Sequence, residues 1–122
     1  MRGGAGVSAV VTVEETKVID IISVDPKSAQ VVLTISDHLD WSDTPRHLET
    51  LQAKLNSYLA FVESGEILDS YPTAVGRQPR IEVVFQFPPE DEGFRFLETA
   101  GSIIRSAGIH FNWRVFGRDL PN

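Results

Sequence analysis

The chain has 122 residues, 42% of them hydrophobic, which is typical of one folded domain with a single core. Its formal net charge of −6 argues against binding the phosphate backbone, so we expect no nucleic-acid partner. The absence of cysteine excludes disulfides, thiol catalysis and thiolate metal sites. We recognise no signal-peptide pattern and no apolar run long enough to span a bilayer, so we expect a cytoplasmic protein with no membrane partner.

The first part of the folded domain is predicted to be a β-hairpin. Residues 1–16 are expected to form a flexible lead-in, and residues 17–24 and 29–36 are two stretches rich in β-branched side chains. Asp25 and Pro26 between them suit the first two positions of a β-turn. We therefore expect two antiparallel strands.

A long helix is predicted from Thr44 to the residue before Gly65. Thr44 is expected to be the N-cap, Pro45 suits the first helical position, and Gly65 suits the position just past the end. At helical spacing, six apolar side chains fall on one stripe about 100° wide, which predicts a face buried in the core. These residues are Leu48, Leu51, Leu55, Tyr58, Leu59 and Val62.

Residues 66–79 are predicted to be a long connection, because two prolines and a glycine interrupt them. Loops of this length are often functional. The alternative, which we favour, is that Ile67, Leu68 and Tyr71 simply hold the connection against an edge of the core.

The rest of the chain predicts a strand at 80–87, a helix at about 90–107 and a strand at 109–116. The order is β-β-α-β-α-β, and strand-helix-strand units form right-handed parallel crossovers. We therefore predict an α/β (α+β) two-layer sandwich, with a four-stranded mixed sheet and both helices on one face. The single domain is expected to span residues 17–116, and a short tail to occupy residues 117–122.

Alternation along the strands predicts one apolar face against the helices and one mixed polar face. In the strand at 80–87, the side chains expected on the apolar face are Ile81, Val83, Phe85 and Phe87. The polar face is expected to carry Thr34, Ser36, Glu82, Gln86, His110, Asn112 and Arg114. It could be a solvated surface with cross-strand pairs such as Glu82 with Arg114. It could instead bind a partner or a second copy, and then Glu82, His110, Asn112 and Arg114 would be its binding residues.

The second helix carries two apolar stripes, although one is enough to cover a sheet. Phe94, Leu97, Gly101 and Ile104 form the predicted core stripe, and Phe96, Ala100, Ile103 and Ala107 form the other. The second stripe either packs on the first helix or awaits a partner. Phe96 and Ile103 are therefore candidate interface residues for a protein partner, including a homodimer.

The turn from Asp37 to His47 concentrates polar and aromatic residues between a strand and a helix. Its candidate binding residues are Asp37, His38, Asp40, Trp41 and His47. A metal site would need two histidines and a carboxylate to converge, and the spacing matches neither H-E-x-x-H nor a calcium loop. The structural alternative is that Asp40 and Asp43 cap the helix or pair with Arg46, while Trp41 closes the end of the core. We predict no metal, no cofactor and no catalytic residue here.

Several segments of this chain resemble a known family. They are D-H-L-D-W from Asp37, the helix from His47 to Gly65 (H-L-x-x-L-Q-x-K-L-N-x-Y-L-x-F-V-E-S-G), and the later Y-P, V-V-F-Q-F and G-F-R-F-L-E stretches. Together they resemble a small bacterial single-domain family of unknown function, over about residues 17–116. The resemblance implies a bacterial cytosolic protein without an established activity.

The sequence thus favours a small acidic domain that acts as a non-enzymatic binding or interaction module, with self-association as one form of it. One version is an accessory protein that neutralises a basic partner, motivated by small size and negative charge. The alternative from another class is a small metal-binding protein or hydrolase-like enzyme centred on the Asp37–His47 turn.

Overall fold

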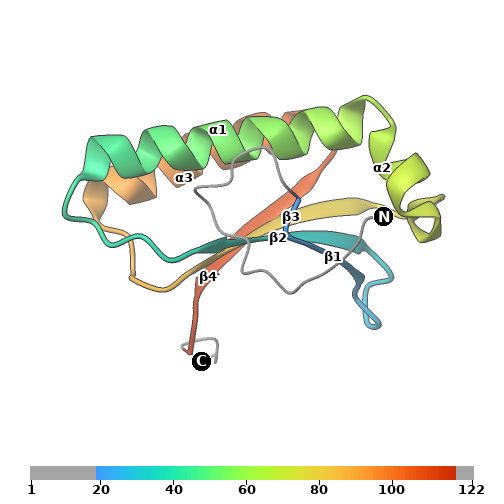
Figure 1. Ribbon diagram of the computed structural model, residues 1–122, viewed down its shortest axis with the longest axis horizontal. Coiled ribbons are helices and arrows are strands. Elements are labelled where there is room, and N and C mark those ends of the chain that lie inside the picture. The colour runs from blue at the N-terminus through green and yellow to red at the C-terminus, as the bar shows by residue number, and fades with distance from the viewer. Residues whose placement is uncertain (1–18, 118–122) are drawn as a thin grey trace.

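The computed structural model describes residues 19–117; the expected lead-in and most of the expected tail lie outside this range. Four strands form one sheet, and two long helices lie on the same side of it (Figure 1). This arrangement confirms the predicted two-layer α/β sandwich and its order of elements.

The strands lie in the sheet in the order in which they occur along the chain. They are β1 (Ile21–Val24), β2 (Val31–Asp37), β3 (Pro79–Phe85) and β4 (His110–Val115). β1 and β2 form the expected antiparallel hairpin, whereas β2, β3 and β4 are parallel. Each crossover therefore returns next to the strand it left, and two crossovers of the same hand place both helices on one face.

The two long helices are α1 (Thr44–Glu63) and α3 (Asp91–Ser106). The connection from α1 to β3, predicted to lack regular structure, contains a short helix α2 (Glu66–Ser70) and a 3-10 helix η2 (Pro72–Ala74). That prediction was wrong because elements of five and three residues are too short to show a helical period. Ile67 is buried and Tyr71 packs against the core, as expected, whereas Leu68 is 44% exposed. Within residues 19–117, no helix is both long and apolar enough to cross a bilayer.

The ends of α1 follow from local chemistry. The N-cap is Asp43, one residue earlier than predicted, because its carboxylate accepts a hydrogen bond from the backbone N–H of Arg46 at 3.3 Å. Gly65 has a φ of 84°, a conformation that glycine adopts without strain, so it ends the helix as predicted.

The core lies between the sheet and the two helices. Its buried apolar residues include Leu33, Ile35, Leu51, Leu55, Tyr58, Ile81, Val83, Phe85, Leu97, Ile104 and Phe111. Each large side chain buried here contributes roughly 1.5–3 kcal/mol before entropy is counted. Gly101 lets α3 approach β4 closely, since a Cβ at this position would lie 3.0 Å from the ring of Phe111.

Two residues assigned to the core are exposed. Phe87 is 41% exposed because β3 ends at Phe85 and the chain then turns away. Phe94 is 47% exposed because it lies in the first turn of α3, over the edge strand. The centroid of its ring lies 5.6 Å from that of Trp113. Alternation and helical period predict the direction of a side chain, but they do not show where an element ends or where the sheet has its edge.

Candidate functional site

The turn between β2 and α1 folds through short-range hydrogen bonds. Asp40 accepts hydrogen bonds from the backbone N–H and the hydroxyl of Ser42 at 3.1 and 2.7 Å, which hold the pKa of the Asp40 carboxyl below its usual range. Asp43 caps α1, as described above. The predicted cap at Asp40 was therefore wrong, and the two carboxylates organise the backbone of the turn.

His47 is buried, and both nitrogens of its imidazole ring have partners. Nε2 lies 2.6 Å from Oδ2 of Asp37, and Nδ1 lies 3.0 Å from the carbonyl oxygen of Asp40. Because a carbonyl oxygen can only accept a hydrogen bond, Nδ1 must carry a proton. A second proton lies between Nε2 and the buried carboxylate of Asp37, since two bare acceptors would repel each other at 2.6 Å. This pair ties the end of β2 to the first turn of α1.

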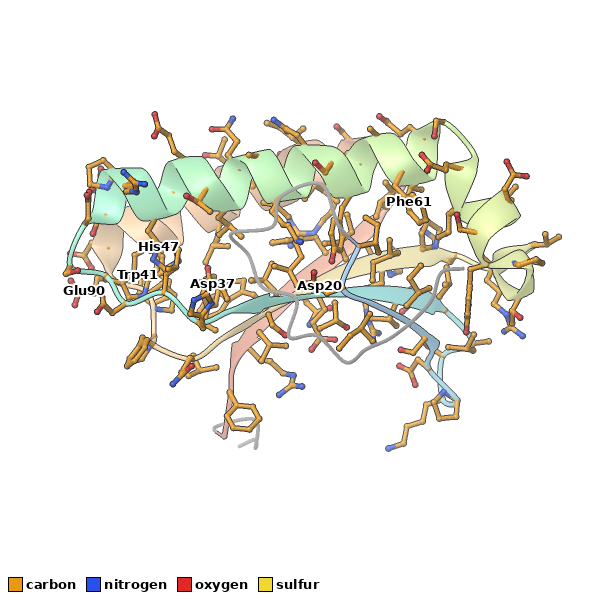
Figure 2. The ribbon with its side chains drawn as sticks, in the orientation of Figure 1. Asp20, Asp37, Trp41, His47, Phe61 and Glu90 are labelled. Atoms are coloured by element: carbon orange, nitrogen blue, oxygen red, sulfur yellow. The ribbon has the colours of Figure 1, made fainter. Side chains whose placement is uncertain are left out.

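Trp41 closes the end of the core, as the structural interpretation of the turn predicted. Its ring stacks on that of His47, with centroids 3.7 Å apart and planes inclined by 20°, and its Nε1 donates to the carbonyl oxygen of Phe87 at 3.0 Å. Figure 2 shows Trp41 and His47 between the start of α1 and the sheet, with Asp37 beside them. A Cβ on Gly93 would lie 3.3 Å from the Trp41 ring, so α3 also packs tightly here.

The candidate residues of the turn do not share one site. Asp40 and His47 line one hollow of about 330 Å³, whereas Asp37 and His38 line another of about 340 Å³ with Gln86. Neither nitrogen of His47 is available to accept a further proton or to bind a metal in this geometry. Among residues 19–117, no three His, Asp or Glu side chains are grouped so that they could hold a metal ion.

The polar face of the sheet carries the pair predicted for it. Nε of Arg114 donates to Oε2 of Glu82 at 2.8 Å. His110 is also engaged, because the side-chain amide of Gln30 donates to its Nδ1 at 2.6 Å. Asn112 is exposed on the same face.

Arg80 extends this network, although no pattern in the sequence marks it. Its guanidinium donates to the side chains of Gln30 at 2.9 Å and Asp25 at 3.2 Å. The pKa of Asp25 is lowered, mainly by a hydrogen bond from the backbone N–H of Lys27 and also by Arg80. Most charged groups on this face are therefore already paired with one another, which favours the solvated-surface interpretation.

The second stripe of α3 lies beside α1 without filling the space between the two helices. A groove of about 200 Å³ remains there. Its lining residues are Gln52, Leu55, Asn56, Leu59, Phe96, Thr99, Ala100, Ile103 and Ile104. Both candidate interface residues thus line one groove, with Phe96 half-buried and Ile103 58% exposed.

A buried ion pair, which the sequence patterns did not predict, lies beneath α1. Nζ of Lys54 lies 2.9 Å from Oδ1 of Asp20, and both side chains are almost fully buried. The hydroxyl of Tyr58 accepts from the backbone N–H of Asp20 at 2.8 Å and donates to the carbonyl oxygen of Thr34 at 3.1 Å. Lys54 falls at helical spacing within the apolar stripe, and a cation in that position is a signal for a buried partner.

These features define a two-layer α/β domain with the buried pairs Asp37–His47 and Asp20–Lys54 and with an apolar groove in its helical layer. The sequence profile of the family of unknown function DUF6572 matches residues 11–117. The chain therefore belongs to that family, which confirms the resemblance to a single-domain family of unknown function. No match was found among curated proteins or among solved structures.

Proposed function

We propose that this domain is a non-catalytic interaction module that binds a protein partner in the groove between α1 and α3. One observation carries the proposal: the groove is accessible, and none of the nine residues that line it is charged. Of all residues in the chain 23% are charged, and these nine positions have apolar or uncharged polar side chains only. The centres of protein interfaces are depleted of charged residues in the same way.

The outer surface of α1 extends the uncharged region. Between Glu49 and Glu63 the exposed residues are Gln52, Ala53, Asn56 and Ala60. Helix positions that face only solvent usually carry charged side chains. Lys54, the one charged residue in this stretch, points into the core and pairs with Asp20. The middle of α1 therefore has the composition of a contact surface.

The turn supports the metal-binding or hydrolase alternative less well. A general base or metal ligand needs a nitrogen with a free lone pair, and His47 uses both of its nitrogens to hold the fold. The groove, in contrast, has no partner within residues 19–117 that would fill it.

The test uses the absence of cysteine, which makes an introduced thiol a unique attachment point. Thr99→Cys places a benzophenone label at the groove, and Thr73→Cys places the same label on an exposed residue of η2 as a matched control. After illumination in an extract of the producing cells, adducts are identified by mass spectrometry. We expect a protein identified in the adduct at position 99 and absent at position 73, competed by unlabelled protein and lost when Ile103→Lys is added. Equal labelling at both positions, or no protein adduct at position 99, would overturn the proposal.

A further inference from the structure

We infer that the occupant of the α1–α3 groove is a second copy of this chain, packed helical layer against helical layer about a two-fold axis. The inference rests on the proposed function, because it names the partner for the same groove. Ile103 is the most accessible apolar side chain in the lining.

The groups around the groove are self-complementary. A two-fold interface places one patch against the same patch of the partner, so residues near the axis meet their own kind. Charged groups would repel each other in that arrangement, whereas the amides of Gln52 and Asn56 and the hydroxyl of Thr99 can each both donate and accept. The uncharged apolar and polar lining therefore suits a copy of itself.

The same lining argues against a basic partner. A basic protein would be expected to select carboxylates, and the carboxylates of α1 that are exposed lie at Glu49 and Glu63, outside the lining. For an acidic chain, association through an uncharged surface also keeps the charges of the two copies away from the contact.

Shape supports a reciprocal contact. Ile103 lies on one wall of the groove and is 58% exposed, so it does not fill the space beside it. Protein cavities of about 150 Å³ hold a benzene ring, and this groove of about 200 Å³ can accept a side chain of similar size. Across a two-fold axis, Ile103 of each copy can enter the groove of the other.

The helical layer sets the size of such a contact. The 20 residues of α1 and the 16 residues of α3 give helices about 30 and 24 Å long, and two helices packed 8–10 Å apart present a face about 20 Å wide. A standard interface buries about 800 Å² per partner, which is a patch about 28 Å on a side. The helical layer is smaller than that patch, so we expect a weak dimer that forms as the concentration rises.

The test is sedimentation equilibrium of the purified full-length chain over a wide concentration range. We expect the wild-type mass to rise from 13.5 kDa towards twice that value. Ile103→Lys should weaken association at least tenfold, because it places two lysines at the contact. Val75→Lys is the matched control: it adds the same charge at an apolar residue that is 65% exposed and lies beyond η2, away from the groove. This control should associate like the wild type, and all three proteins should have the same melting temperature when dilute.

The possible failures can be told apart. A wild-type protein that stays monomeric at every concentration would overturn the second copy as occupant. A dimer that Ile103→Lys does not weaken would overturn it as well, because the contact would lie elsewhere. In either case, an identified adduct of another protein at position 99 would leave the proposed function standing. Absence of that adduct would overturn both the second copy as occupant and the proposed function.

Discussion

The turn from Asp37 to His47 and the groove between α1 and α3 contrast in how their side chains are used. The turn is rich in titratable side chains, yet its buried pair, Asp37 with His47, is fully engaged in holding β2 to α1. The groove contains no titratable group, yet its apolar side chains remain accessible. The residue types that are usual in reactive sites therefore hold this fold together, and we propose that a partner binds elsewhere, in the groove. Binding of a partner requires side chains that the fold leaves accessible.

The largest effect is expected from His47→Ala, which tests the structural role of the turn. It leaves the buried carboxylate of Asp37 without its partner and removes the ring that stacks on Trp41. Removing one member of a buried pair typically costs about 3–5 kcal/mol. We expect a loss of that size in the free energy of unfolding, measured with urea.

Asp37→Asn should lower the free energy of unfolding less than His47→Ala does, because an amide can still form a hydrogen bond with Nε2 of His47. A His47→Ala protein as stable as the wild type would show that His47 is dispensable for folding. That result would favour a chemical role for the turn.

A somewhat smaller effect, about 3 kcal/mol, is expected from Asp20→Ala. This change leaves the ammonium of Lys54 buried without the carboxylate that lies 2.9 Å away. The double variant with Lys54→Met should recover most of the loss, because a buried pair can be replaced by apolar side chains at little cost. Urea unfolding of both variants measures the difference, and a double variant no better than the single one would contradict this interpretation.

The smallest effect concerns Tyr58 and pH. Burial raises the pKa of its hydroxyl above the ordinary value of 10.0. Between that value and the raised one, the unfolded chain releases this proton while the folded chain keeps it, so stability falls as pH rises above 10. Tyr58→Phe should cost about 1 kcal/mol near neutral pH through its lost hydrogen bonds. It should also reduce the fall in stability at alkaline pH; an unchanged alkaline slope would argue against a buried neutral hydroxyl.

Much of this fold could be predicted from local patterns. The stripe on α1 and the alternation in β2 and β3 depend only on neighbours in sequence, and they placed Leu51, Leu55 and Ile81 in the core correctly. The partners of Asp37 and Lys54 could not be predicted in this way. Asp37 and His47 meet only once the turn has folded, and Asp20 reaches Lys54 only once β1 has paired in the sheet.

The candidate interface was predicted in part. The second stripe of α3 indicated that Phe96 and Ile103 share a face, but the sequence left open whether α1 covers them. That outcome depends on the distance between two helices, which is set by the packing of both on the sheet. Side-chain spacing within one helix contains no information about it.

Hydrogen exchange of the purified chain, compared between dilute and concentrated solutions, tests the contrast between the two regions most directly. A contact in the groove should slow the opening of the helices that form it. We predict added protection on concentration in the segments 52–59 and 96–104, which line the groove, and no change across the turn at 37–47. Protection that is independent of concentration in both helices, or that grows only at the turn, would contradict the account.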